Sequence, residues 1–132
     1  MSVFVDTSAL LAVLNSGDEN HARASRSFRS LVESDEPLMT TSYVLVETVA
    51  LLQHRFGLGA VRGFQDAVAP VLAVVWVDSE LHAEGTSALL TANRRELSFV
   101  DCVSFACMRR HEVVRAFHFD RHFTEQGFEA AP

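Results

Sequence analysis

Four acidic residues stand in or directly after apolar stretches of this 132-residue sequence: Asp6, Glu47, Asp101 and Asp120. An isolated carboxylate in such a place is costly to desolvate or takes up a proton, so buried acids are normally paired or bound to a metal. The chain contains no lysine, and only Arg121 directly abuts one of the four acids. A divalent cation is therefore a natural partner for them, although an arginine from elsewhere in the chain could do the same.

The chemistry that four carboxylates support depends on the metal. Hard carboxylate oxygens suit Mg²⁺ or Mn²⁺, whereas zinc more typically draws histidine or cysteine ligands. Such a metal lowers the pKa of a bound water, orients it and stabilises charge on a phosphate, and two metals about 4 Å apart could act on the attacking and the leaving oxygen. The pattern predicts metal-assisted phosphodiester hydrolysis, with all four acids as metal ligands and catalytic residues.

Two of the acids also have a purely structural interpretation as helix caps. Asp6 could simply end a strand and start a helix, with Thr7 and Ser8 as competing caps. Asp101 follows Ser98 by three residues, which resembles a capping box with aspartate in place of glutamate or glutamine. Capping and metal binding are compatible, so both interpretations stay open for these residues.

The other two acids have alternatives of a different kind. Glu47 could be a surface glutamate at a helix edge, and Asp120 could pair with Arg121 or cap the turn that follows it. In addition, His118, Asp120 and His122 alternate along the chain and could instead form a zinc or transition-metal site. The joint occurrence of four acids in apolar contexts favours the hydrolytic interpretation over each of these.

The elements that must position the acids follow from the hydrophobic pattern. A short apolar strand at 2–5 ends at Asp6, and a helical pattern begins at once. Further helices are expected at about 19–32, 42–56, 60–68, 80–92 and 99–111, and further strands at 37–40, 71–77 and 113–117. The continuous apolar run at 71–77 suits a strand covered on both faces, as in a parallel sheet. This alternation indicates an α/β fold in which only the last few residues look untethered.

That order of elements would bring the acids together. Active sites of open parallel sheets form beyond the carboxyl ends of the strands, at the switch in strand order. Asp6 and Asp120 each fall directly after an apolar strand, and Glu47 and Asp101 lie near the starts of helices that follow turns. We therefore expect all four at one edge of the sheet.

Composition and charge narrow the class of protein. The length suits one domain, residues 1–132, that folds without stabilising cross-links. A net charge of −6 argues against binding of duplex DNA through a broad positively charged surface. All eleven basic side chains are arginine. The N-terminus has no positive n-region and no stretch approaches the roughly 20 apolar residues of a membrane span, so we expect a cytoplasmic protein with no membrane association.

Two further expectations concern thiols and apolar surface. Cys102 and Cys107 would be reduced and buried, because residues five apart on one helix are too far apart for a disulfide. Hydrophobic content of 48% is slightly rich. The apolar residues at 28–31 and 43–52 are candidates for a dimer or partner surface, although a buried core explains them equally well.

At its acidic segments the chain resembles the PIN-domain nucleases, and most closely the VapC-type toxins of type II toxin-antitoxin pairs. The matching segments are FVDTSALLAVL, SYVLVETVALL, LSFVDCVSFACMRR and AFHFDRHFTEQGF, which together frame nearly the whole chain. The family places metal-binding acids where Asp6, Glu47, Asp101 and Asp120 stand, and none is missing, so an active nuclease is favoured. The hydroxyls of Thr7 and Ser8 could orient a metal ligand or a metal-bound water, and helix capping is an equal alternative.

The resemblance implies a three-layer α/β/α sandwich with a central, mostly parallel sheet and dependence on Mg²⁺ or Mn²⁺. It also implies cleavage of RNA, assembly into a homodimer, and inhibition by a small cognate antitoxin that covers the active site. Two alternatives stay open: a housekeeping PIN nuclease of RNA processing, and a PIN-like module that binds RNA or protein without cutting. The compact length favours the toxin.

Overall fold

A five-stranded, all-parallel sheet lies at the centre of the computed structural model, which describes residues 1–131. The strand order is β3-β2-β1-β4-β5, and the strands are β1 (Val3–Val5), β2 (Leu38–Thr41), β3 (Leu72–Val75), β4 (Arg115–Phe117) and β5 (Glu129–Ala130). Val3 of β1 lies opposite Leu38 of β2 and Arg115 of β4. All three side chains of β1 are buried, as expected for the middle strand of a sheet with helices on both faces.

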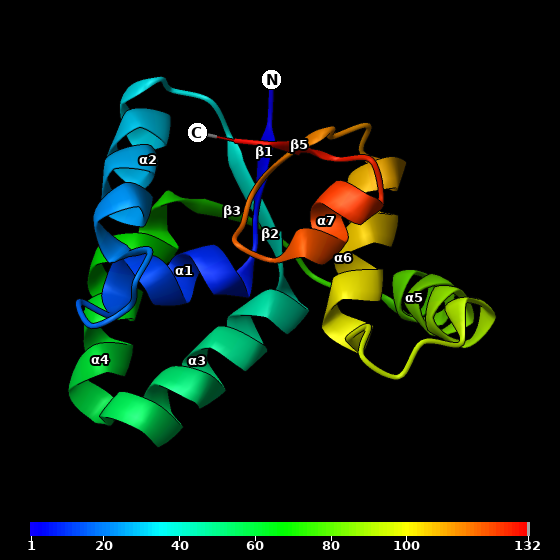
Figure 1. The fold of residues 1–132 in the computed structure, drawn as a ribbon, viewed down its shortest axis with the longest axis horizontal. Helices are drawn as coiled ribbons and strands as arrows, with labels where there is room; N and C mark the ends of the chain where they lie inside the picture. Colours follow the sequence, from blue (N-terminus) through cyan, green and yellow to red (C-terminus); the bar gives the residue numbers. More distant parts are fainter. Residues whose placement is uncertain (132) are drawn as a thin grey trace.

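Helices cover the sheet on both sides (Figure 1). They are α1 (Thr7–Leu14), α2 (His21–Glu33), α3 (Ser42–Phe56), α4 (Leu58–Gly63), α5 (Ser79–Ala92), α6 (Phe99–Arg110) and α7 (Arg121–Glu125), with a π-helical turn η1 (Phe64–Val68) and a 3₁₀ turn η2 (Ala69–Val71) before β3. Figure 1 shows α1, α2 and α4 on one side of the strands and α5, α6 and α7 on the other. The predicted three-layer α/β/α architecture is confirmed.

Polar residues fix where most of these helices begin. A side-chain oxygen accepts a hydrogen bond from a backbone N–H in the first turn of α1, α3, α5, α6 and α7, and the capping residues are Asp6, Thr41, Asp78, Ser98 and Asp120. Such a bond satisfies one of the amide groups that the start of a helix leaves without a partner. Two of the four candidate acids are therefore held at fixed positions at the ends of β1 and β4.

The two outer strands differ from the sequence-based expectation. The run at 71–77 forms an edge strand in which Ala73 is exposed, and Trp76 just beyond it is 74% exposed, so the predicted coverage on both faces is wrong. The expected loose chain end is also wrong, because β5 pairs in parallel with β4 and the Ala131 amide donates to the Ala116 carbonyl at 2.8 Å. An apolar run cannot distinguish an edge strand from an inner one, and two residues are too short to show a pattern.

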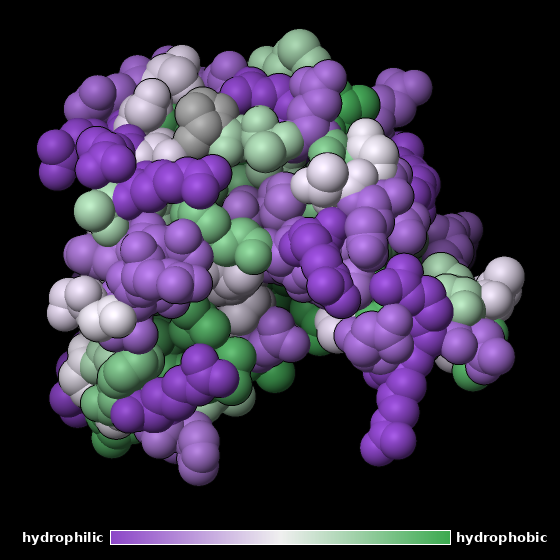
Figure 2. Space-filling model, in the orientation of Figure 1, coloured by the Kyte–Doolittle hydropathy of each residue, from purple (hydrophilic) through white to green (hydrophobic). Residues whose placement is uncertain are grey.

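The apolar segments at 28–31 and 43–52 divide between core and surface. Leu31 is buried and Phe28 stacks on Phe117 of β4 with ring centroids 6.5 Å apart, so the first segment belongs to the core. On α3, Leu52 is buried whereas Val46 is 66% exposed. Green surface accordingly appears over α3 and α4 in the space-filling view (Figure 2).

The helices α5 and α6 pack at very close range. Gly85 of α5 lies against Val103 of α6, and a Cβ atom at Gly85 would stand 2.4 Å from Val103 Cγ2 and 3.2 Å from Val103 Cα. Cys102 and Cys107 of α6 are buried free thiols, as predicted. Within residues 1–131, no helix is long and apolar enough to cross a membrane.

Candidate active site

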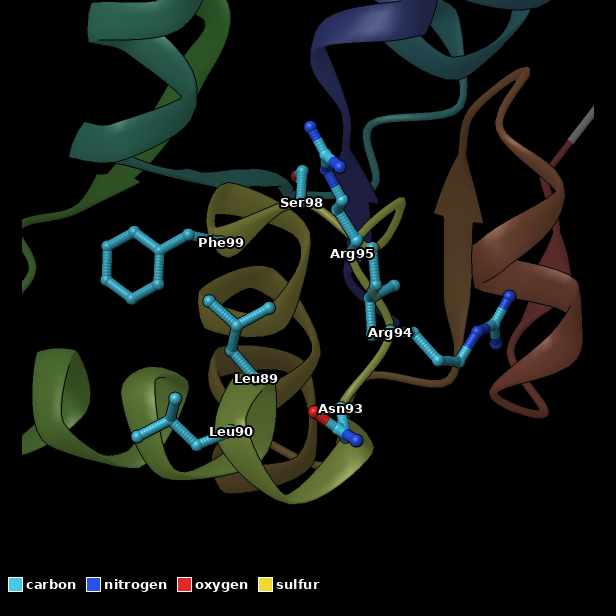
Figure 3. A pocket seen from close by; sticks show the side chains of 8 residues that line it. Leu89, Leu90, Asn93, Arg94, Arg95, Ser98 and Phe99 are labelled. Atoms are coloured by element: carbon cyan, nitrogen blue, oxygen red, sulfur yellow. The ribbon is translucent and has the colours of Figure 1, made fainter.

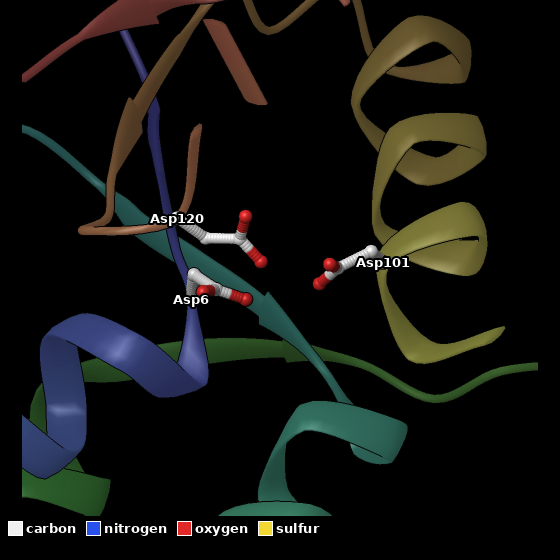
Figure 4. A group of neighbouring side chains, drawn as sticks. All are labelled: Asp6, Asp101 and Asp120. Carbon is white, nitrogen blue, oxygen red and sulfur yellow. The ribbon is translucent and has the colours of Figure 1, made fainter. Parts of the chain in front are cut away.

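Three of the four predicted acids converge at the switch in strand order. The chain leaves β1 toward β2 and β3 and returns on the other side through β4, so β1 and β4 are neighbours whose carboxyl ends point the same way. Asp6 directly follows β1, Asp120 follows β4, and Asp101 lies in the first turn of α6. One carboxylate oxygen of each lies within 4.8 Å of those of the other two (Figure 4).

The fourth acid lies in the same hollow but outside this group of three. Glu47 is half-buried on α3, and its charge raises the pKa of both Asp6 and Asp101. Together the four acids line a hollow of about 360 Å³. Figure 2 shows this face of the molecule hollowed between the α3–α4 side and the α6–α7 side.

Ser8 holds Asp6 and joins it to the far end of the chain. Its hydroxyl donates to Asp6 Oδ2 at 2.6 Å, and its backbone N–H donates to the same oxygen at 3.1 Å. The Ser8 hydroxyl also accepts a hydrogen bond from the Phe119 backbone N–H at 2.9 Å. One side chain thus couples the carboxylate after β1 to the backbone that carries Asp120.

The capping interpretation is confirmed for Asp6 and Asp120, and neither cap displaces the shared site. Asp6 caps α1 and Asp120 caps α7, and each also belongs to the group of three. At α6 the cap is Ser98, whose hydroxyl accepts from the Asp101 N–H at 2.9 Å. Within residues 1–131, Asp120 makes no ion pair with Arg121.

The alternative zinc site is not formed. The only group of three or more potential ligands within residues 1–131 is aspartate alone and includes neither His118 nor His122. The His118 ring instead stacks on Phe123, with centroids 4.9 Å apart. Burial lowers the pKa of His118, which favours a neutral packing role.

Burial, and to a smaller extent the charges of neighbouring acids, makes Asp6 and Asp101 unfavourable as free anions. Burial raises the pKa of Asp6 to about 6, with smaller contributions from the charges of Asp120 and Glu47, against the lowering effect of the Ser8 hydrogen bonds. Burial first, and then the charge of Asp6 and a hydrogen bond with Asp120, raise the pKa of Asp101 to about 9. Without a cation, Asp101 therefore retains its proton near neutral pH.

These residues fit a divalent metal. The donors are hard carboxylate oxygens from three separate elements, close enough to share one ion. A cation would offset the burial and the like-charge repulsion that raise the pKa values of Asp6 and Asp101. Thr7 and Ser8 also line the hollow, and Thr7 Oγ1 accepts a hydrogen bond from Thr48 at 3.3 Å. The arrangement suits Mg²⁺ or Mn²⁺ better than zinc, because no histidine or cysteine belongs to the group of three.

The acidic hollow is also lined by Glu96 and His122, which the sequence did not predict as parts of an acidic site. Glu96 is exposed in the loop before α6 and pairs with Arg94 at 2.9 Å, and His122 is buried with Nδ1 3.0 Å from Glu125 Oε1. Glu96 stands in a polar segment that gives no sign of a site. His122 was considered only as a zinc ligand, although its place two residues after Asp120 put it beside the acids.

Comparison with known proteins agrees with this geometry. The family model of the PIN domain matches residues 3–129. The 23S rRNA-specific endonuclease VapC20 of Mycobacterium tuberculosis is 37% identical over 127 residues, which cover 96% of this chain and 95% of that protein. The VapC ribonuclease of Aquifex aeolicus is 23% identical over 125 residues, covering 95% and 92%.

Solved structures show the same relationship. The crystal structure of Mycobacterium tuberculosis VapC20, described as a sarcin-ricin loop cleaving toxin, matches with a TM-score of 0.82 and 38% identity over 96% of this chain and 95% of that one. VapBC2 of Rickettsia felis, bound to a promoter DNA fragment, matches with a TM-score of 0.73 at 9% identity, covering 98% and 97%, which is a likeness of fold alone.

Proposed function

The chain belongs to the PIN-domain family, and on that premise we propose that it is a metal-dependent endoribonuclease that acts as the toxin of a toxin-antitoxin pair. The observation that carries the proposal is the convergence of Asp6, Asp101 and Asp120 at the strand switch, with Glu47 in the same hollow. Carboxylates this close together are costly unless a cation joins them, and a cation held by oxygen ligands is suited to phosphodiester hydrolysis.

The three aspartates would hold Mg²⁺ or Mn²⁺. When bound, the ion would supply an activated water and stabilise charge on the scissile phosphate. Ser8 fixes the position of the Asp6 carboxylate, and its bond to the Phe119 N–H fixes the segment before Asp120. Precise placement of ligands by such supporting contacts is what tunes a metal site.

Glu47 and Glu96 add to the negative charge of the hollow, which bears on how RNA can bind there. Both line it, on α3 and in the α5–α6 loop, and they add negative charge to that of the aspartates. Phosphate entering this hollow without a cation would meet only repulsion from these carboxylates. We therefore expect productive RNA binding at the acids to require the metal.

The substrate class follows from the relative of highest identity described above. Because a 23S rRNA-specific endonuclease is 37% identical over nearly the whole chain, we propose 23S rRNA, and its sarcin-ricin loop in particular, as the RNA to test first. A cognate antitoxin that covers the hollow and a homodimeric assembly complete the proposal. The VapBC complex of the same fold supports the antitoxin partner.

The test is cleavage of a 23S rRNA fragment containing the sarcin-ricin loop by purified, antitoxin-free protein. We expect cutting with Mg²⁺ or Mn²⁺, none with EDTA, and a loss of about 100-fold or more in Asp6→Asn and Asp101→Asn, as is typical when a group that stabilises transition-state charge is removed. Asp66→Asn is the matched control, because Asp66 is exposed on η1 and does not line the hollow.

The controls separate the possible failures. Cutting that survives both EDTA and the two aspartate substitutions would contradict the proposed site. Metal binding by a folded protein that cuts neither this RNA nor total cellular RNA would instead support a non-catalytic binding module.

A further inference from the structure

We propose that a second hollow, beside the acidic one, binds a nucleotide of the RNA strand next to the scissile phosphate. This hollow has a volume of about 510 Å³ and lies between the end of α5 and the start of α6 (Figure 3). Its walls include Leu89, Leu90, Asn93, Arg95, Ser98 and Phe99. The inference rests on the proposed ribonuclease function and adds where the strand lies outside the acids.

The two hollows meet at Ser98. This residue lines both of them, and its hydroxyl accepts a hydrogen bond from the backbone N–H of Asp101, the α6 member of the acidic group. A strand with one phosphate at the acids would therefore pass directly into the second hollow with its next nucleotide.

Arg95 supplies an uncommitted positive charge in this hollow. Its neighbour Arg94 is engaged by Glu96 at 2.9 Å and Glu125 at 3.5 Å, whereas Arg95 is exposed and makes no ion pair with any residue of 1–131. Figure 3 shows the two side chains diverging, with Arg94 extending toward α7 and Arg95 extending away from it, past Ser98. A guanidinium in this position is suited to bidentate contact with a phosphate.

The remaining wall suits a base. Leu90 is 73% exposed, and Leu89 and Phe99 are half-buried, so apolar side chains face the opening of the hollow. The Phe99 ring is held in place by His82 and Tyr43, with centroid distances of 5.1 and 5.9 Å. Single-stranded RNA is bound by this combination of cationic and flat apolar groups, because bases stack while phosphates pair.

Asn93 adds a group that can read a base. It ends α5 in the left-handed conformation, with φ of 52°, and its side chain lies at the rim of the hollow (Figure 3). A side-chain amide carries both donors and an acceptor, which match the edge of a base. A purely apolar protein segment would leave both Arg95 and this amide without a partner, so the chemistry favours a nucleotide.

The first test measures RNA binding without cutting. All variants carry Asp101→Asn, which removes cutting, and are measured with Mg²⁺ present, because RNA binding at the acids is expected to require the cation. The probe is a fluorescein-labelled RNA hairpin with the sarcin-ricin loop sequence. We expect Arg95→Gln to weaken binding by about 5- to 10-fold and to reduce the slope of log K against log salt by about 0.7, the value for one phosphate contact on a single strand. Arg62→Gln is the matched control, since Arg62 is exposed on α4 and makes no ion pair with any described residue.

A second variant separates the base from the phosphate. Leu90→Ser changes an exposed side chain, so the fold is retained, and we expect binding to weaken by about 3-fold with no change in the salt slope, because stacking on an apolar surface carries no charge. In the protein that retains Asp101 and cuts RNA, Arg95→Gln should lower kcat/KM by the same factor as the affinity. The kcat at saturating RNA should stay within about 2-fold, because a contact made equally in the ground state and the transition state affects only binding.

Three results would overturn the inference: unchanged RNA affinity in both variants, an equal loss in Arg62→Gln, or an Arg95→Gln protein that binds RNA normally but no longer binds its antitoxin. The last result would assign the hollow to a protein partner. Failure of the ribonuclease proposal is recognisable separately, because wild-type protein would then cut no RNA with metal present whatever the binding of the Arg95 variant.

Discussion

Helix α6 takes part in two regions that are built in opposite ways. Asp101 and Val103 are two residues apart on this helix and so point in nearly opposite directions. Asp101 enters a group of like charges, whereas Val103 packs on Gly85 at a distance that leaves no room for a Cβ atom. The first contact costs stability in the metal-free protein, and the second contributes it.

The difference shows how the acidic group can persist. A repulsive arrangement stays in place only if the elements that carry it are fixed by other contacts. On α6 that fixation comes from the α5 contact and from the Ser98 cap, and at Asp6 it comes from Ser8. Stability and chemistry are thus assigned to opposite faces of one helix.

The largest effect should come from breaking the α5–α6 contact. Gly85→Val would force atoms against the Val103 backbone as well as its side chain, so we expect the free energy of unfolding in urea to fall by about 3 kcal/mol or more. Gly63→Val is the matched control, because a Cβ at Gly63 meets nothing within 4 Å, and its change should stay within about 0.5 kcal/mol. Equal losses in the two variants would show that the contact has no special role.

A cation should remove the cost of the acidic group, and pH should reveal that cost. The folded pKa values of Asp6 and Asp101, about 6 and about 9, lie above the unfolded value of 3.8. Between these values the folded state binds more protons than the unfolded state, so the stability of the metal-free protein falls as pH rises from about 4 toward 9.

Mg²⁺ or Mn²⁺ at about 100 times its Kd should restore about 2.7 kcal/mol. The cation competes with the retained proton, so its affinity should increase with pH. Thermal unfolding with EDTA or with metal, at a series of pH values between 5 and 8, measures both effects. Metal-free stability that is independent of pH would contradict the cost of ionising these buried acids side by side.

The smallest effect should come from removing one member of the repulsive group. Asp101→Asn has no carboxyl to protonate on folding, so in EDTA near pH 7 we expect it to be more stable than wild type by on the order of 1–2 kcal/mol. Its stability should also fall less steeply with pH. Urea unfolding of this variant measures whether the acidic face of α6 lowers stability, and Asp66→Asn, which should match wild type, is the control. A lower free energy of unfolding in Asp101→Asn alone would contradict the claim that the acidic face costs stability.

The acids could be predicted because strand ends determine their positions. Asp6 and Asp120 follow apolar strands, and in a parallel sheet these ends must lie at one edge, so chain order was enough to bring them together. Asp101 was expected at the same edge because it lies near the start of a helix that follows a turn, and it is found in the first turn of α6. How far Glu47 lies from the other three depends on the angle at which α3 leaves β2, and no local pattern records that angle.

Other features depend on contacts between distant segments and left no local sign. Gly85 is compatible with any ordinary helix until Val103 is placed against it, and β5 is too short to show alternation. Glu96 reaches the hollow only because the loop between α5 and α6 turns toward α7, where Arg94 meets Glu125. Sequence patterns identify the elements, whereas these residues acquire their roles from how the elements meet.

The hydrogen bond from Phe119 to Ser8 also has a consequence for the order of events during synthesis. It joins residues 111 positions apart: Ser8 lies shortly after β1, and Phe119 lies directly before Asp120. The sheet order requires β4 to arrive beside β1 before this bond can form. A nascent chain that has not yet reached Asp120 therefore lacks the group of three acids, however well its earlier segments have folded. On the function proposed here, it would be harmless to RNA until the segment that carries Asp120 has been made and β4 has paired with β1.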